Sequence, residues 1–214
     1  MQGNRFIQLL LITATMLVIN VALAYEEVED LVNIFSTDSR FIAVVDGRRN
    51  FEENQRAAEA IQWQGAKGEV GAFLTTERLL AVSVRSGQWN TRYLKINEKK
   101  TPPRMLLAAH LVVMLTDERI VGFGTQTGGF FQERLPIGES IIASEAEGRV
   151  AAVVTPDRAY GLSAYRRGAA EIRFRIQERF ESVKTTYNTI TLRTSQRLIT
   201  LAAGDAVWRD IDLD

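Results

Sequence analysis

Residues 149–165, RVAAVVTPDRAYGLSAY, decide the fold of this 214-residue chain. At their centre Thr155 and Arg158 enclose Pro156 and Asp157, which are typical turn residues. Apolar residues fill both flanks of this Thr-x-x-Arg step, so the segment predicts two short β-strands joined by a tight turn.

The Thr-x-x-Arg step occurs five times along the chain. The pairs are Thr37/Arg40, Thr75/Arg78, Thr116/Arg119, Thr155/Arg158 and Thr194/Arg197, and successive arginines are 38 to 41 residues apart. A fixed period of this length is typical of repeat architectures. When the copies are aligned on their arginines, both flanks show the two-residue alternation of β-strands.

The fourth copy shows the expected unit most clearly. Its strands are predicted at 140–146, 149–155, 158–165 and 169–176, with turn residues between them. Four short strands in about 39 residues match one blade of a β-propeller. We therefore predict an all-β fold, a small five-bladed β-propeller with up to four antiparallel strands per blade, in a single domain over residues 25–214.

The first copy departs from this pattern. Only residues 25–30 are available for its first strand, and an unpaired edge there would favour oligomers. Residues 51–60 are rich in helix formers and predict a helix or a long loop, and 51–63 is the best candidate for an amphipathic surface helix.

Small and aromatic residues recur at fixed distances from each arginine. Three residues after it come Ala43, Ala81, Gly122, Gly161 and Thr200, which predict close approach of a neighbouring strand. Eleven residues after it come Phe51, Trp89, Phe130, Ala169 and Trp208. We expect these aromatic residues to pack between blades. The alternative is a binding platform for a sugar or peptide, with Trp89 and Trp208 as binding residues.

The repeated arginines also have two interpretations. Each can pair with a carboxylate of its own turn, such as Glu77, Asp117, Glu118 or Asp157, as exposed local ion pairs commonly do. Alternatively, Arg78, Arg119 and Arg158 lie on one rim and bind an anionic ligand. We expect the first arrangement, so a structural role is predicted for these candidate binding residues.

Two segments carry a resemblance to a known family. Residues 81–87 and 122–128 end in Ser-Gly and Thr-Gly, and an aromatic residue follows each of them. They resemble the tryptophan-docking repeats of quinoprotein-type propellers, in which Ala-x-Asp-x-x-Thr-Gly precedes a tryptophan. Ser83 and Gly124 replace the aspartate, and Phe130 replaces one tryptophan. The resemblance implies similar hairpin chemistry and no quinone site.

The N-terminus predicts export. Arg5 precedes an uncharged run over residues 6–24 that ends in Ala22-Leu23-Ala24, the small-x-small pattern of a signal peptide. We expect a signal peptide at 1–24 and a periplasmic or secreted bacterial protein. The alternative is an uncleaved segment that anchors the chain in the inner membrane.

Catalytic and cofactor motifs are weak. The chain contains no cysteine and one histidine, His110, in the apolar run 105–114, where a satisfied, partly buried histidine is expected. Lysines plus arginines and aspartates plus glutamates each total 26, a balance that gives no support to a nucleic-acid partner. We expect no metal and no cofactor.

The predicted function is therefore non-enzymatic: an exported propeller that binds or scaffolds a protein, peptide or glycan. The alternative is a glycan hydrolase or lyase with carboxylates at the propeller axis. Candidate acids for that alternative are Glu145, Glu147, Asp157, Asp205 and Asp210.

Overall fold

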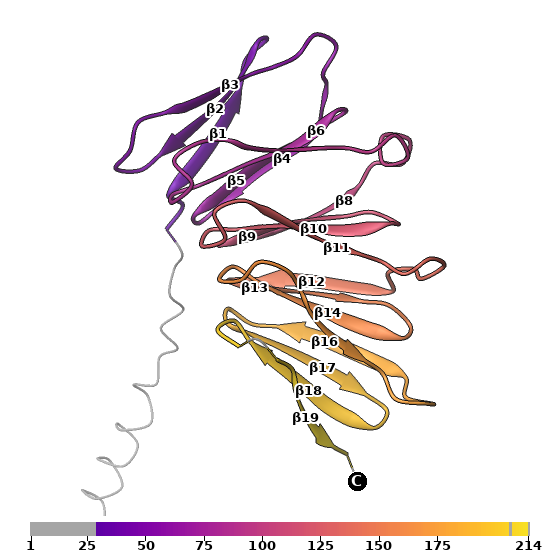
Figure 1. Cartoon of the computed structure of the whole chain (residues 1–214). Coiled ribbons are helices and arrows are strands. Elements are labelled where there is room, and N and C mark those ends of the chain that lie inside the picture. The colour runs from indigo at the N-terminus through magenta and orange to yellow at the C-terminus, as the bar shows by residue number, and fades with distance from the viewer. Residues whose placement is uncertain (1–28, 206, 214) are drawn as a thin grey trace, which may run out of the picture.

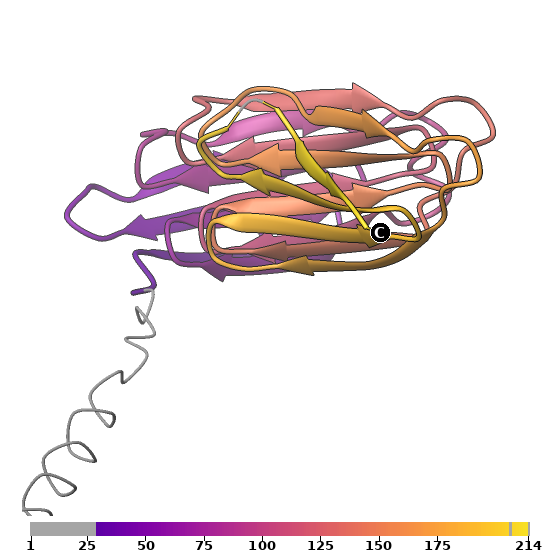
Figure 2. The same cartoon turned by 90° about the horizontal axis from the view of Figure 1, so that it is seen from below.

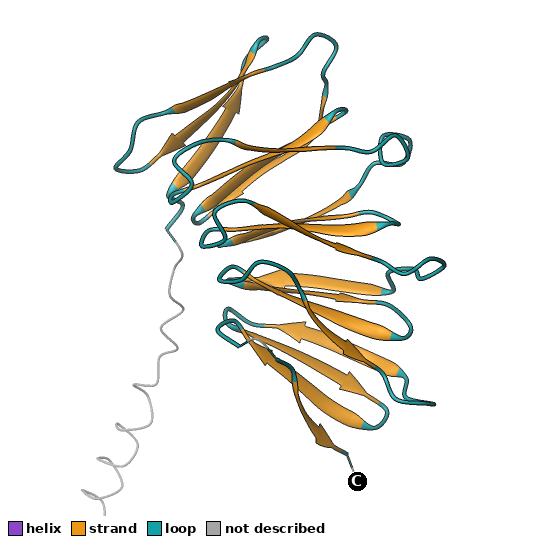
Figure 3. Ribbon diagram, viewed as in Figure 1, coloured by secondary structure: helices purple, strands orange, loops and turns teal. Residues whose placement is uncertain are grey.

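A computed structural model describes residues 29–205 and 207–213 of the chain. Within these residues the chain forms strands joined by turns and loops, and none of it is helical (Figure 3). In this part of the chain, no helix is long and apolar enough to cross a membrane. The predicted signal segment, 1–24, lies outside the described residues.

The strands form five antiparallel sheets, which we call blades 1 to 5 in chain order. Blade 1 contains β1 (Val32–Ser36), β2 (Arg40–Val45) and β3 (Phe51–Asn54). Blade 2 contains β4 (Ile61–Lys67), β5 (Val70–Thr75), β6 (Arg78–Ser83) and β7 (Asn90–Tyr93). Blade 3 contains β8 (Arg104–Ala108), β9 (Leu111–Leu115), β10 (Arg119–Gly124) and β11 (Phe130–Arg134). Blade 4 contains β12 (Ala143–Glu147), β13 (Val150–Val154), β14 (Arg158–Ser163) and β15 (Ala170–Arg173), and blade 5 contains β16 (Phe180–Thr185), β17 (Thr189–Thr194), β18 (Arg197–Ala202) and β19 (Arg209–Asp212).

Each sheet is a simple meander, and every Thr-x-x-Arg step forms the same hairpin turn in it. The five arginines begin β2, β6, β10, β14 and β18. In blade 2 the Thr75 hydroxyl accepts a hydrogen bond from the Arg78 N–H at 3.0 Å and donates one to the Arg78 carbonyl at 3.0 Å. The predicted repeat of β-hairpins and the all-β fold of five blades are therefore confirmed.

The blades stack face to face in a row, with blades 1 and 5 at its two ends (Figure 1). Seen from below, they overlap one another (Figure 2). The described residues form four buried apolar clusters, and each cluster lies between two consecutive blades. Strands β5, β6, β9, β10 and β13 are buried on both faces, whereas β2 and β17 alternate between buried and more exposed residues. The row therefore has two open end faces.

Blade 1 lacks the counterpart of the first strand that blades 2 to 5 possess. The segment expected to supply it, 25–30, lies outside the described residues except for Glu29 and Asp30, which are not in a strand. The helix considered at 51–63 is wrong, because this segment forms β3, a short loop and the start of β4. The apolar side chain of Phe51 packs against blade 2, and this tertiary contact overrides the helix preference of the polar residues that follow.

Two of the small residues, Gly122 and Gly161, lie where other side chains approach closely, as predicted, whereas Thr200 lies on the outer face of blade 5, which no other described strand covers. A Cβ atom on Gly122 would lie 2.2 Å from the Phe131 ring, and one on Gly161 would lie 2.3 Å from Leu201. The two hairpins that resemble the tryptophan-docking repeats contain equivalent hydrogen bonds. The Thr127 hydroxyl donates to the Gly124 carbonyl at 2.8 Å, and the Ser86 hydroxyl donates to the Ser83 carbonyl at 3.2 Å.

Candidate binding surface

A short sequence repeat, Leu-x-Ile-x-Glu, forms the turn between successive blades. Residues 94–98 and 135–139 match it fully, 174–178 begins with phenylalanine, and 55–59 keeps only the glutamate. The glutamates follow the repeat arginines at a fixed distance of 19 or 20 residues, so the pattern is visible in the sequence. Its role, however, appears only in the contacts of the folded chain.

The glutamate first closes its own turn. In the loop before β4, the Glu59 carboxylate accepts a hydrogen bond from the Arg56 N–H at 2.9 Å. Glu98 and Glu178 accept the equivalent N–H groups of Lys95 and Arg175 at 2.7 and 2.5 Å. The residue before the glutamate has a left-handed φ in three of the four turns: +63° at Ala58, +85° at Gly138 and +63° at Gln177.

The same glutamate then binds the arginine of the blade that follows it. Arg78 donates from Nε to Glu59 at 2.9 Å and from Nη2 to the other carboxylate oxygen at 3.2 Å. Nη2 also donates to the carbonyl of Asn54, the last residue of β3, at 2.6 Å. Arg78 thereby ties blade 2 to blade 1, and we call this arrangement of arginine, glutamate and carbonyl a clasp.

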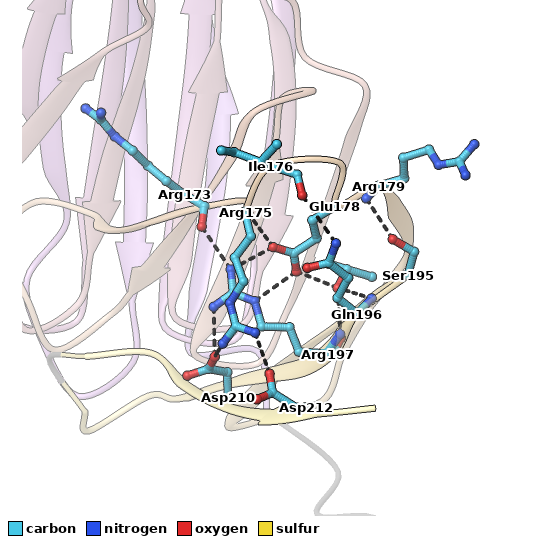
Figure 4. Close-up of polar contacts among 11 residues, drawn as sticks. Arg173, Arg175, Ile176, Glu178, Arg179, Ser195, Gln196, Arg197, Asp210 and Asp212 are labelled. Carbon is cyan, nitrogen blue, oxygen red and sulfur yellow. Dashed lines mark hydrogen bonds and ion pairs between the residues drawn. The ribbon is translucent and has the colours of Figure 1, made fainter. Parts of the chain in front are cut away.

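The arginine–glutamate pair recurs between every two consecutive blades, and the complete clasp with its carbonyl forms at three of the four junctions. Arg119 binds Glu98 and the Tyr93 carbonyl, and Arg197 binds Glu178 and the Arg173 carbonyl (Figure 4). Arg158 pairs with Glu139 at 2.7 Å, although its Nε has no partner. The prediction that these arginines pair with Glu77, Asp117, Glu118 or Asp157 of their own turns is wrong. The threonine hydroxyl already completes the turn, and the arginine side chain enters the gap between blades.

In each clasp the glutamate neutralises the charge of the arginine, away from solvent. The side chain of Arg78 is 2% exposed and that of Glu59 is fully buried. Burial by itself raises the pKa of Glu59, but hydrogen bonds from Arg78, the Arg56 N–H and Thr75 outweigh it, so the pKa is lowered. Glu98 and Glu178 have lowered pKa values for the same reasons. Arg78, Arg119 and Arg158 thus occupy separate, neutralised clasps and are not gathered around a shared site.

Three of the four copies of the turn repeat contain its isoleucine, and each of them exposes this side chain to solvent. Ile96, Ile137 and Ile176 are 78%, 107% and 92% exposed, and we call them the isoleucine tips. They lie on the loops at the same end of the blades as the clasps, to the right in Figure 1, and Figure 4 shows Ile176 on its turn. Single exposed apolar side chains are common, but three at equivalent positions on one side form a pattern.

A cavity of about 500 Å³ is lined by residues of the two loops that carry Ile96 and Ile137. It lies between the loop that follows Ile96 and the loop that follows Ile137, and the turn of blade 3 forms its floor. Its lining combines Pro102, Pro103 and Ile141 with Asp117 and Arg104. This end of the blades therefore combines exposed isoleucine side chains with a cavity that polar and apolar residues line.

The opposite end of the blades carries a different polar cluster. His110 lies 3.1 Å through Nδ1 from Glu69 of blade 2 and 2.6 Å through Nε2 from the Tyr187 hydroxyl of blade 5. Tyr187 reaches across blade 4 because Gly148 has no side chain: a Cβ there would lie 2.3 Å from the Tyr187 carbonyl. A cavity of about 200 Å³ adjoins His110 and Arg149. The prediction of a buried, hydrogen-bonded histidine is confirmed, and its partners come from distant blades that the sequence pattern does not connect.

The two candidate tryptophans lie in the layers between blades. Trp89 is 8% exposed and donates from Nε1 to the Phe51 carbonyl of blade 1 at 3.1 Å. Trp208 is 7% exposed and donates to the Ala170 carbonyl of blade 4 at 2.8 Å. Both positions are those expected for packing between blades.

The carboxylates considered for glycan cleavage are spread over blades 4 and 5. Glu145 accepts a hydrogen bond from the Thr185 N–H, Asp205 pairs with Arg209, and Asp210 pairs with Arg197. Within the described residues, no group of three or more histidine, aspartate or glutamate side chains is arranged to hold a metal ion.

No protein-family model and no curated protein matches the chain. Solved structures with a similar arrangement include the N-terminal domain of Nup159, with 8% identity, a TM-score of 0.35 and coverage of 86% of this chain and 58% of that one. Prp20p from Saccharomyces cerevisiae has 12% identity, a TM-score of 0.39 and coverage of 81% and 58%. Hsv2 from Kluyveromyces lactis has 9% identity, a TM-score of 0.38 and coverage of 87% and 74%. The chain spans less than two thirds of the length of Nup159 and Prp20p.

The sheets, their order and the repeated clasps define the class of protein. The chain is a β-propeller repeat protein whose five blades stand in a row and are joined by buried arginine–glutamate pairs.

Proposed function

We propose that this chain is an exported, non-enzymatic scaffold that binds another protein through the isoleucine tips. The exposure of Ile96, Ile137 and Ile176 carries the proposal. The glutamate of each turn stabilises that turn through its backbone hydrogen bond and its pairing with arginine, so the turn does not require the isoleucine. A polar residue in place of the isoleucine would improve solubility. Apolar anchors within a charged surround are typical of protein interfaces.

The surroundings of the tips support a protein partner. Lys100, Arg104 and Asp117 are exposed nearby and have no side-chain partner among the described residues, so they are available to pair across an interface. The cavity beside Ile96 and Ile137 offers a place for a side chain of the partner. The burial of Trp89 and Trp208 favours the isoleucine tips over an aromatic platform for a sugar or peptide as the binding surface.

Export is part of the same proposal and rests on the N-terminal sequence. The uncharged run 6–24 and its Ala-Leu-Ala ending predict cleavage after Ala24 and a periplasmic or secreted location. Mass spectrometry of the protein from its native host would test this, because a chain that begins at Tyr25 is expected. A chain that retains residues 1–24 would instead support a membrane anchor.

Photocross-linking in the native host tests the binding surface. We expect a photoreactive amino acid at position 137 to form protease-sensitive adducts, whereas the same group at position 207 gives at least tenfold less. Val207 is the matched control, because it is 68% exposed and lies outside the turns between blades. Ile96→Ser combined with Ile176→Ser should abolish the adducts at position 137 and leave the melting temperature unchanged. Equal adducts at both positions, or adducts that the double variant retains, would overturn the proposal.

A further inference from the structure

Each end of the row carries one half of a clasp. At the start, Thr37 and Arg40 form the usual turn, with the Arg40 N–H bonded to the Thr37 hydroxyl at 3.1 Å. No blade precedes Arg40 among the described residues, so its side chain is 54% exposed and pairs only with Glu52, itself 49% exposed. The arginine of blade 1 thus lacks the turn glutamate that its four counterparts bind, and it lacks the carbonyl that Arg78, Arg119 and Arg197 bind.

The complementary half lies at the end of the row. Asn54, Tyr93 and Arg173 are the strand residues whose carbonyls receive the arginine of the following blade. Each stands opposite the repeat arginine of its own blade, and in blade 5 that position belongs to Asp212, opposite Arg197. No arginine among the described residues binds the Asp212 carbonyl. Blade 5 therefore offers the acceptor for an arginine in the position of Arg40.

Each end face also carries exposed apolar side chains, in places where an interior blade would be covered by its neighbour. On the outer face of blade 1, Phe35 is 55% exposed and stands opposite Ile42, next to Val44 at 37%. On the outer face of blade 5, Ile211 is 70% exposed and stands opposite Leu198. In the interior of the row, equivalent faces press against the next blade and form the buried clusters.

We propose that copies of this chain associate head to tail, with blade 5 of one copy stacked on blade 1 of the next. The junction would continue the interface that already joins the blades: Phe35, Ile42 and Val44 of one copy would face Leu198 and Ile211 of the other, and Arg40 would bind the Asp212 carbonyl. This contact is heterologous, so it produces a closed ring or an open filament according to its rotation. It uses the end faces and is independent of the isoleucine tips.

Two blocked variants test the polarity of the junction. Phe35→Lys blocks the head, and Ile211→Lys blocks the tail; both side chains are largely exposed, so the fold is expected to survive. In sedimentation velocity, the wild-type chain should form oligomers that grow with concentration, and each variant alone should stay monomeric. Their equimolar mixture should form a dimer and nothing larger, because one intact head meets one intact tail.

Other results overturn the proposal. A wild-type chain that remains monomeric up to millimolar concentration excludes the junction. A variant that dimerises alone shows contact between two heads or two tails, and a mixture that remains monomeric while the wild type associates shows that the end faces are not involved. Arg40→Ala should weaken association at least tenfold, and Arg48→Ala, which changes another exposed arginine in the turn between β2 and β3, should leave it unchanged. Equal effects of the two alanine variants would exclude the clasp at the junction.

Discussion

The environment of each repeat arginine decides whether it stabilises the fold. Arg78 and Arg40 occupy the same position in two identical turns, yet one side chain is 2% exposed and the other 54%. An exposed pair gains little because water screens it, whereas a buried pair leaves an uncompensated charge when one partner is removed. The same residue type thus has two energetic roles within one repeat.

Arg78→Ala is expected to lower the free energy of unfolding by about 3 to 5 kcal/mol, because Glu59 is left buried without its cation. Arg40→Ala is the matched control and should cost no more than about 1 kcal/mol. Urea denaturation at neutral pH measures both values, at a protein concentration where the chain is monomeric. Equal small losses would show that the clasp between blades 1 and 2 does not hold them together.

The turns between blades and the layers they join act as elements. The layer between two blades consists of apolar side chains from both sheets, and the clasp lies at one end of that layer. In the layer between blades 4 and 5, Trp208 packs against Gly161. A Cβ atom added to Gly161 would lie only 2.7 Å from the indole ring of Trp208. The glycine and the tryptophan therefore depend on each other, although they are far apart in sequence.

Trp208→Ala should destabilise the protein by about 3 to 5 kcal/mol, the usual cost of a cavity left by a large buried aromatic side chain. Val207→Ala, next to it in the chain but 68% exposed, should change stability by less than about 0.5 kcal/mol. Thermal and urea denaturation of both variants checks this. If Trp208→Ala kept its stability but lost binding of a ligand, the tryptophan would belong to a binding platform.

At the scale of the whole molecule, the row leaves its two ends less covered than its middle. Strands of blades 2, 3 and 4 are buried on both faces, and the end blades bury only one. Repeat proteins of this kind derive their stability from contacts between neighbouring repeats. A blade with one neighbour is therefore expected to open more readily than a blade with two.

Amide hydrogen exchange should show this gradient. We expect β9, β10, β13 and β14 to exchange slowest, and the strands of blades 1 and 5 to exchange faster. The Ile211→Lys variant is the suitable sample, because it blocks the end-to-end association that would cover both end faces. Uniform protection across all five blades would contradict the open row.

Local patterns determined the strands, the turns and the number of blades. The Thr-x-x-Arg step encodes a hairpin through bonds within four residues, so all five copies could be recognised without knowledge of their neighbours. Gly122, Gly161 and the two tryptophans were placed correctly at close contacts because their size suits few other environments. Burial of His110 followed in the same way from its apolar flanks.

Only the stacking of the blades decided the partners of the repeat arginines and the exposure of the side chains on the turns and ends. The arginines bind glutamates that lie 19 to 21 residues earlier in the chain, across the gap to the preceding blade, and not the acids of their own turns. Whether an ion pair is buried, whether Ile96 projects into water and whether Arg40 finds a partner all depend on which blade stands beside which. That information lies in contacts between surfaces that meet after the hairpins have formed, and residue spacing along one chain does not report it.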